Sequence, residues 1–243
     1  MIPKIIHYCW FGRKPLPVNV GKYMDSWRKY LPDFEIKEWN EDNFDVNMFA
    51  YTKEAYFAKK YAFVSDVARL WALVNEGGLY LDTDILVLKT FDSVFWTKQA
   101  FIGFEHDHFI GTGLIAAERN HPFFEEFLNS YKSIHFFKGL KYDEETNVCR
   151  ITKSFLQKGL ISDNSNQVVA DVNIYRQEYF CNKIWRENRY YNSEISYAIH
   201  DFQSSWLISR NNFYEKVINR IMNLQTMLRY KIENIGWKFC SFF

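Results

Sequence analysis

Two aspartates stand two positions apart, between short apolar runs, about a third of the way along the chain. Asp82 and Asp84 follow Gly77-Gly78 and precede the run from Ile85 to Leu88. In an extended segment, side chains two positions apart point to the same side, so both carboxylates would face one point. Oxygen-rich sites of this kind suit hard divalent cations such as Mg²⁺ or Mn²⁺. The spacing therefore predicts a cation site that holds a diphosphate.

A clearly amphipathic helix is predicted from Ala62 to Glu76, directly before this stretch. Asp66 and Arg69 lie three positions apart on one face of that helix, where their side chains can meet. Gly77-Gly78 supplies the C-terminal stop. Because the helix leads straight to the aspartates, we expect Asp66 and Arg69 near the cation site. The alternative is an ion pair on a solvent-exposed face, worth only ~0.3–0.5 kcal/mol.

The remaining pattern alternates strands and helices and favours an α/β fold whose ligands meet the carboxyl ends of the strands. Trp10 ends a predicted first strand, and His200 follows Ala198-Ile199 late in the chain; each could instead be a core residue. The predicted helices cover residues 18–30, 48–60, 62–76, 91–96, 122–131 and 151–158. The predicted strands cover residues 2–10, 34–39, 100–104, 114–117 and 168–175, with a Gly111–Gly113 loop between the third and fourth.

The composition is that of an ordinary globular protein with many aromatic residues. The 243 residues suffice for one large α/β domain or two small ones, and the net charge of +1 argues against a general nucleic-acid binder. The four cysteines show no CxxC and no zinc-ligand spacing, so we expect reduced thiols in a cytoplasmic protein. No segment resembles a signal peptide or reaches the length of a membrane span.

The C-terminal tail is basic and has apolar residues at helical spacing. From Leu207 to Phe243 there are six lysines and arginines against two glutamates. Such a tail can rest on anionic lipid as a peripheral membrane contact. It can equally pack on the core or on a partner. We expect a domain over residues 1–206 and a basic amphipathic helical tail over 207–243.

Several motifs resemble, in order along the chain, those of the DXD sugar-binding glycosyltransferases. The block Ser65-Asp66-x-x-Arg69 … Gly77-Gly78-x-Tyr80-x-Asp82-x-Asp84 is the most specific of them. The opening Ile2–Gly12, the segment Ile174–Phe180 and Ile199-His200-x-x-x-x-Ser205-Trp206 are similar to further family elements. The group holds yeast initiating mannosyltransferases, bacterial capsular polysaccharide synthesis enzymes and, more distantly, clostridial glucosylating toxins.

The resemblance implies a GT-A fold, a single Rossmann-like α/β domain. It also implies a retaining hexosyltransferase that uses a nucleotide sugar, with UDP favoured, and Mn²⁺ or Mg²⁺. The acceptor would be a glycan or lipid-linked oligosaccharide in surface or capsular polysaccharide synthesis. If the basic tail binds lipid, a cytoplasmic protein of this kind would lie on the inner face of the membrane.

The resemblance also implies a role for each site residue. The catalytic candidates are Asp82, Asp84 and Arg69. Asp84 would bind the metal directly, and Asp82 would touch ribose and reach the metal through water. The further expected contacts are Trp10 on the base, Asp66 and Arg69 on the ribose and sugar region, Tyr80 on the nucleotide, His200 or Ser205 on the metal, and Trp206 on the diphosphate.

One departure and two rival functions remain. Gly111-Thr112-Gly113 stands where the family pattern leads us to expect an asparagine on the acceptor side. The first rival is a haloacid-dehalogenase-type phosphatase, but Leu86 occupies the usual Thr/Val place and the aspartates do not open the chain. The second is a non-catalytic nucleotide-sugar binder, although none of the expected charged residues has been lost.

Overall fold

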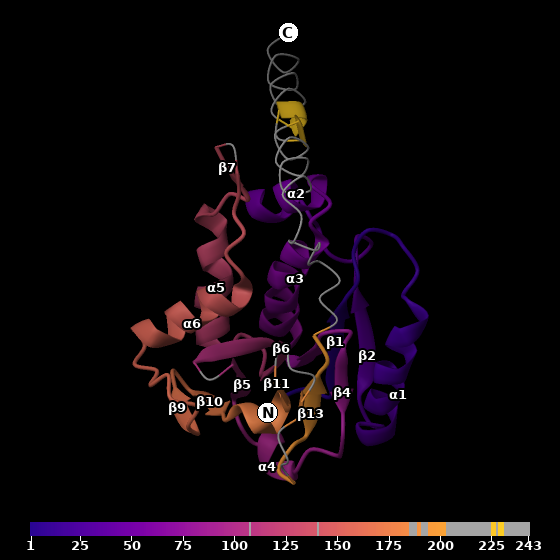
Figure 1. Ribbon diagram of the computed structural model, residues 1–243, viewed down its shortest axis with the longest axis vertical. Coiled ribbons are helices and arrows are strands. Elements are labelled where there is room, and N and C mark those ends of the chain that lie inside the picture. The colour runs from indigo at the N-terminus through magenta and orange to yellow at the C-terminus, as the bar shows by residue number, and fades with distance from the viewer. Residues whose placement is uncertain are drawn as a thin grey trace.

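A seven-stranded mixed sheet forms the centre of the computed structural model (Figure 1), which describes residues 1–106, 108–139, 141–184, 189–190, 194–202, 225–226 and 228–230. In spatial order the strands are β2 (Glu35–Trp39), β1 (Ile5–Cys9), β3 (Gly78–Leu81), β6 (Phe109–Ala117), β5 (Ala100–His106), β10 (Val172–Tyr175) and β9 (Gln167–Val169). β1 runs parallel to β2 and β3, and β10 runs parallel to β5. β6 is antiparallel to both of its neighbours. As a result, β1, β2, β3 and β5 end, and β6 begins, at the same edge of the sheet.

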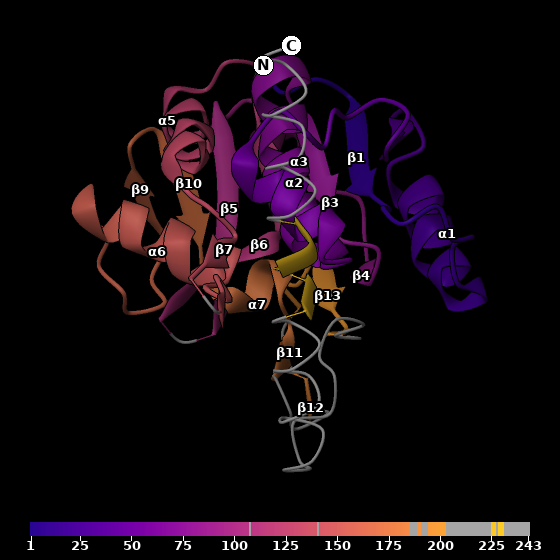
Figure 2. The same ribbon diagram turned by 90° about the horizontal axis from the view of Figure 1, so that it is seen from above.

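Helices cover both faces of this sheet. They are α1 (Gly21–Tyr30), α2 (Ala50–Phe57), α3 (Tyr61–Glu76), α4 (Ser93–Trp96), α5 (Pro122–Ser130), α6 (Asn147–Gln157) and α7 (Gln177–Phe180), with 3₁₀ turns at Val18–Val20 and Tyr131–Ser133. Seen from above, α5 and α6 flank one side and α1 the other (Figure 2). The described residues also form three short strand pairs: β4 (Ile85–Val87) with β13 (Ala198–His200), β7 (Phe137–Lys138) with β8 (Lys141–Tyr142), and β11 (Lys183–Ile184) with β12 (Arg189–Tyr190).

Strand β3 shows how the sequence builds two cores. Successive side chains of a strand point to opposite faces of the sheet. Tyr80 packs into the core that α3, α5 and α6 cover, whereas Leu79 and Leu81 pack into the core that α1 and α4 cover. All three residues are buried. This is the α/β architecture that the resemblance to GT-A enzymes implies, and the predicted fold class is confirmed.

The predicted helix over residues 62–76 is confirmed as α3, and the two glycines after it are needed sterically. The Gly77 amide donates to the Leu73 carbonyl at 2.9 Å and ends the helix. Gly77 and Gly78 have φ values of 67° and 114°, in the region that favours glycine. A Cβ at Gly78 would lie 2.6 Å from the Ile5 carbonyl oxygen of β1. The glycines therefore let α3 turn directly into β3 beside β1.

Two strand predictions were wrong. Residues 111–113 do not form a loop but belong to β6. That strand begins at Phe109, five residues before the predicted start at Leu114, and its Ile110 pairs with Phe104 of β5 across an irregular register. Residues 168–175 are not one strand but the hairpin of β9 and β10. Ala170 and Asp171 turn the chain there with φ values of 49° and 61°. Two consecutive positive φ values suit the tight turn of a hairpin.

The predicted domain limit at 206 and most of the tail over 207–243 lie outside the described residues. Described tail residues contact the domain, among them Tyr230 and Thr226. The Tyr230 ring lies 5.1 Å from that of Phe57 in α2 and 4.9 Å from that of Phe137 in β7, between centroids. Thr226 hydrogen-bonds Tyr142 of β8. Among the described residues, no helix is long and apolar enough to cross a membrane.

Candidate functional site

The two aspartates lie in the turn between β3 and β4. The extended conformation predicted for this stretch was wrong, because the Ile85 amide donates to the Asp82 carbonyl at 3.0 Å and closes a turn. The side chains still converge. One ligand atom each from Asp82, Asp84 and His200 lies within 4.8 Å of the other two. The structure thus brings together three of the predicted metal ligands.

His200 reaches the aspartates through a strand pair. In the antiparallel pairing of β13 with β4, His200 stands opposite Ile85, directly after Asp84. The amide of Asp201 then donates to the Asp84 carbonyl at 3.0 Å. His200 Nε2 lies 3.3 Å from Asp84 Oδ1. Two residues 116 positions apart are therefore held side by side by main-chain hydrogen bonds.

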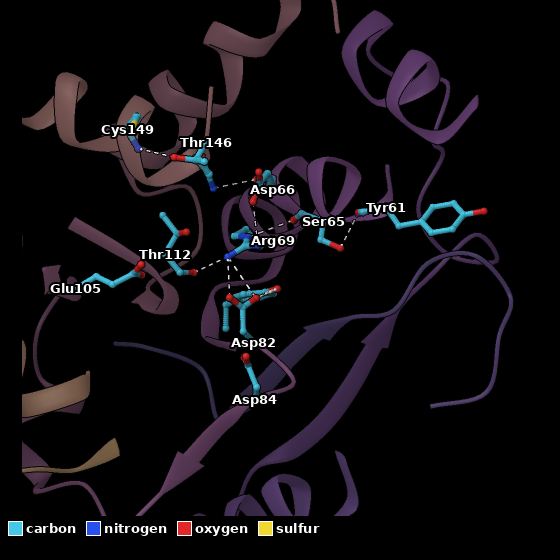
Figure 3. A network of polar contacts seen from close by, with 12 residues as sticks. Tyr61, Ser65, Asp66, Arg69, Asp82, Asp84, Glu105, Thr112, Thr146 and Cys149 are labelled. Carbon is cyan, nitrogen blue, oxygen red and sulfur yellow. Dashed lines mark hydrogen bonds and ion pairs between the residues drawn. The ribbon is translucent and has the colours of Figure 1, made fainter. Parts of the chain in front are cut away.

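Arg69 stands at the centre of a second group of contacts (Figure 3). Its guanidinium lies between Asp66 of the same helix, Asp82 and the Thr112 carbonyl of β6. Nη2 is 2.9 Å from Asp66 Oδ1, and Nη1 is 3.3 Å from Asp82 Oδ1 and 2.7 Å from Thr112 O. The Arg69 side chain is only 6% exposed and that of Asp66 only 14%. The alternative of a solvent-exposed intrahelical pair is therefore wrong.

Tyr80, which lies in β3 two positions before Asp82, contacts the Asp82 carboxylate. Its hydroxyl donates to Asp82 Oδ1 at 2.7 Å, and Arg69 lies over its ring, 4.7 Å from the centroid. Burial raises the pKa of Tyr80, so the hydroxyl keeps its proton and donates. Tyr80 thus holds the Asp82 carboxylate in place through this hydrogen bond. A contact with the nucleotide itself stays a prediction.

Burial sets the protonation of the charged groups. It raises the pKa of Asp66 to about 6, although the positive charge of Arg69 opposes the shift. Burial opposes protonation of His200, but the neighbouring Asp84 carboxylate raises the pKa of His200 well above its ordinary value. Buried charges of this kind persist only where opposite charges or a cation compensate them.

Trp10 follows β1 and therefore stands at the same edge of the sheet as Asp82. Its amide donates to the Trp39 carbonyl at 2.9 Å, and its indole Nε1 donates to the Lys14 carbonyl at 2.7 Å. The side chain is only partly buried. Its predicted stacking on a base stays a prediction, as does the role of every site residue. Ser205 and Trp206 lie outside the described residues.

The sequence analysis missed Glu105, which lies one residue before the end of β5, beside the predicted ligands. Glu105 Oε2 lies 3.8 Å from His200 Nδ1, and burial raises the pKa of Glu105 although His200 opposes the shift. A signal was present, because Glu105 directly follows an apolar strand, as Asp82 does. Both strands end at one edge of the sheet, but their adjacency depends on the strand order, which the sequence does not show.

The arrangement suits a divalent cation that carries an anion. Two carboxylates are the ligands preferred by Mg²⁺ and Mn²⁺, and an imidazole in the same set favours Mn²⁺ of these two. A bound cation would compensate the negative charge of Asp82 and Asp84 and leave positions for phosphate oxygens. The residues present therefore fit the cation that the resemblance implies.

Parts of the chain are similar to known glycosyltransferases. Residues 17–101 match the family model described as the glycosyltransferase sugar-binding region containing a DXD motif. An uncharacterized glycosyltransferase of Acanthamoeba polyphaga mimivirus is 28% identical over 230 residues, which cover 85% of this chain and 84% of that protein. A toxin of Yersinia ruckeri is 35% identical over 101 residues, which cover 42% of this chain but 5% of the toxin. The solved structure of the PaToxG glycosyltransferase aligns with 65% of this chain and 69% of its own, at 20% identity and a TM-score of 0.48.

Proposed function

We propose that this DXD-motif glycosyltransferase needs a divalent cation and transfers a hexose, with retention of configuration, from a nucleotide sugar to a glycan or lipid-linked acceptor. A single observation carries the proposal. Asp82, Asp84 and His200 offer ligand atoms within 4.8 Å of one another, inside the region that matches the family model or paired directly against it. A nucleoside diphosphate is the natural anion for such a site, because its oxygens chelate hard cations.

The cation would be held by Asp84 and His200 directly and by Asp82 through water, with Ser205 as a further candidate ligand. When bound, it stabilises the negative charge that develops on the leaving diphosphate. Arg69 adds a fixed positive charge on the other side of Asp82, 3.3 Å from its Oδ1. A fixed charge of this kind needs no reorganisation as the sugar–phosphate bond breaks.

The nucleotide would extend from the cation toward the ends of β1 and β2. Trp10 would stack on the base, Asp66 and Arg69 would contact ribose and sugar, and Trp206 would contact the diphosphate. In support, Trp10 and Asp82 follow neighbouring parallel strands that end at one edge of the sheet. Uridine is favoured as the base by the resemblance, and Mn²⁺ over Mg²⁺ by the imidazole ligand.

The acceptor would belong to surface polysaccharide synthesis, with the protein working in the cytoplasm at the inner face of the membrane. Peripheral membrane contact would come from the basic tail over residues 207–243. The described tail residues Thr226 and Tyr230 instead contact the domain. Sedimentation with anionic liposomes separates the two, because a tail truncation lowers pelleting only if the tail binds lipid.

A donor screen tests the proposal. The chain is incubated with a panel of nucleotide sugars and Mn²⁺, and release of free sugar and nucleoside diphosphate is measured. We expect one donor to be hydrolysed, hydrolysis to stop on chelation and Mn²⁺ to restore it. Hydrolysis that persists in chelator would contradict a metal-dependent site. Tight binding of one nucleotide sugar without turnover, with or without acceptor, would instead indicate a non-catalytic binder.

Neither the structure nor the comparisons support the alternative function as a haloacid-dehalogenase-type phosphatase. Asp82 follows the third strand of the chain rather than the first, and its carboxylate already binds Tyr80 and Arg69. A nucleophilic aspartate needs a free oxygen aimed at phosphorus. Assay of the same samples with phosphomonoesters supplies the control, and we expect no release of phosphate.

A further inference from the structure

We propose that Glu105 is a positioning residue that orients the His200 imidazole toward the cation, and that Gly111 and Gly113 provide the space for this pair. The inference rests on the proposed cation site of Asp82, Asp84 and His200. It adds a residue outside the motifs of the DXD resemblance. It also accounts for the glycines that stand where that resemblance led us to expect an asparagine.

The two ring nitrogens of His200 face different carboxylates. Nε2 lies 3.3 Å from Asp84 Oδ1, on the side where the candidate ligands converge. Nδ1 lies 3.8 Å from Glu105 Oε2, about 1 Å longer than a hydrogen bond. A histidine that binds metal through one nitrogen usually donates its other N–H to a carboxylate, which fixes the tautomer and the ring orientation. Glu105 stands where that second acceptor is needed.

The glycines of β6 make room for both members of the pair. A Cβ at Gly111 would lie 2.9 Å from Cβ and 3.1 Å from Oε2 of Glu105. A Cβ at Gly113 would lie 3.0 Å from Cε1 and 3.1 Å from Nδ1 of His200, and 3.2 Å from Oδ2 of Asp82. Neither glycine has a positive φ, so backbone freedom is not the reason for them. The close approach of the side chains is the reason.

Burial strengthens the interaction between Glu105 and the His200 imidazole. The Glu105 side chain is 12% exposed and that of His200 13%. A carboxylate removed from water to this extent is costly unless a partner compensates it. It also interacts more strongly with a neighbouring N–H than a solvated carboxylate does. Glu105 can therefore hold the ring more firmly than a surface acid can.

Besides Asp84 and Glu105, two more side chains of the described residues touch the same imidazole. The Cys181 thiol hydrogen-bonds His200, and its Sγ also lies 3.6 Å from the Glu105 carbonyl oxygen, to which it donates. The Phe202 ring stacks on the imidazole at 4.2 Å between centroids. Sulfur is a weak acceptor, and a ring face does not choose between tautomers. The carboxylate is the strongest acceptor of the three, so it should dominate the orientation.

The test measures Mn²⁺ bound to the full chain without any donor. Mn²⁺ affinity comes from electron paramagnetic resonance, and imidazole ligation comes from the nitrogen modulation of the spin echo. In Glu105→Leu, which removes the acceptor, we expect a 10- to 100-fold loss of affinity. At saturating Mn²⁺ we also expect the nitrogen modulation to weaken. Glu105→Gln keeps an acceptor oxygen, so its affinity should fall between those of wild type and Glu105→Leu.

Matched variants make the result specific. Glu54→Gln changes another buried glutamate, whose Oε1 lies 2.8 Å from Nδ1 of His135, and should leave Mn²⁺ binding unchanged. His200→Ala should abolish the nitrogen modulation. Circular dichroism and thermal unfolding show whether Glu105→Leu folds, and if it does not, the decision rests on Glu105→Gln and Gly111→Ala.

The outcomes separate this inference from the proposed function. Wild-type affinity and modulation in the folded Glu105 variants, with loss in Asp84→Asn, would overturn the role of Glu105 and keep the cation site. Loss in Cys181→Ala but not in Glu105→Leu would assign the positioning to the thiol. Absence of specific Mn²⁺ binding in wild type would overturn both proposals.

Discussion

The candidate site has two halves that meet at Asp82, and they differ in how their charges are compensated. On the α3 side, Arg69 is contacted by Asp66, Asp82 and the Thr112 carbonyl. On the β4 side, Asp84 and His200 converge with Asp82 around one point where a cation fits. The first half is closed by contacts within the protein. The second is arranged to receive a ligand.

This difference separates stability from function. A buried ion pair that loses one partner leaves an uncompensated charge, which destabilises the fold. On the β4 side, Asp82 and Asp84 repel each other, so neutralising Asp84 relieves this repulsion while it removes the partner of His200. Substitutions on the α3 side should therefore act on folding as well as activity, and those on the β4 side should act mainly on activity.

The largest effect is expected for Asp84→Asn. Loss of a charged metal ligand should lower donor hydrolysis about 1,000-fold, at the upper end of the effect of removing one stabilising group from a transition state. The free energy of unfolding, measured in urea with chelator present, should fall by less than it does in Arg69→Met, because relief of the repulsion from Asp82 offsets part of the lost contact with His200. Asp33→Asn, an exposed aspartate paired with Lys4, serves as the control and should keep full activity. Normal hydrolysis by Asp84→Asn would sink the assignment of the site.

Arg69→Met should, unlike Asp84→Asn, have a large effect on the free energy of unfolding. It leaves Asp66 and Asp82 without their cation in a buried setting and should lower the free energy of unfolding by about 3 kcal/mol. Arg69→Lys should recover only part of the loss, because one ammonium cannot replace contacts made by two guanidinium nitrogens. Urea unfolding followed by circular dichroism measures both variants. A wild-type free energy of unfolding in Arg69→Met would contradict the view that the contacts of Arg69 on the α3 side stabilise the fold.

Gly113→Ala should give a smaller effect on the β4 side. Its methyl group would press on His200 and Asp82, at 3.0 to 3.2 Å. We expect Mn²⁺ affinity to fall about tenfold, by analogy with changes beside metal ligands. Gly21→Ala is the matched control, because a Cβ there meets nothing within 4 Å. Equal Mn²⁺ affinity in both variants would mean that the site adapts to the extra methyl group.

The smallest effect concerns pH and lies away from both halves. His7 is buried, and its ring binds the Gly77 carbonyl and the Trp39 indole. Burial lowers the pKa of His7 below its ordinary 6.5. Below about pH 6.5 the unfolded chain binds a proton that the folded chain does not, so stability falls as the pH falls.

Urea unfolding at pH 7.5 and 5.5, with chelator present, measures this effect. The loss of stability should be about 1 kcal/mol larger in wild type than in His7→Gln. The comparison of variants is needed because Asp66 titrates in the opposite sense: its pKa is raised to about 6, so its contribution to stability increases as the pH falls. Equal losses in both proteins would contradict the assignment to His7.

Much of the site was predictable because its motifs are local. Three features depend only on residues that are close in the sequence. They are the spacing of Asp66 and Arg69 on one helix, the glycine stop after that helix and the short apolar run before Asp82. The structure confirms the helix, forms a strand over Gly78–Leu81, and brings Asp66, Arg69, Asp82 and Asp84 into one group of side chains. The predicted extended run through Asp82 and Asp84 failed, because a main-chain hydrogen bond from Ile85 closes a turn that the residue types do not reveal.

The sequence by itself determined the α/β class, the α3–β3 unit and the two aspartates proposed as ligands, since periodicity and glycine positions act over short distances. Only the tertiary structure decided the rest. Glu105 and Gly113 come to the site because β6 lies between β3 and β5, and β13 pairs with β4 to bring His200 beside Asp84. Strand order is set by packing of both faces of the sheet at once, and no local pattern encodes it. For that reason Asp84 was found from its spacing, whereas Glu105 was found only from its neighbours.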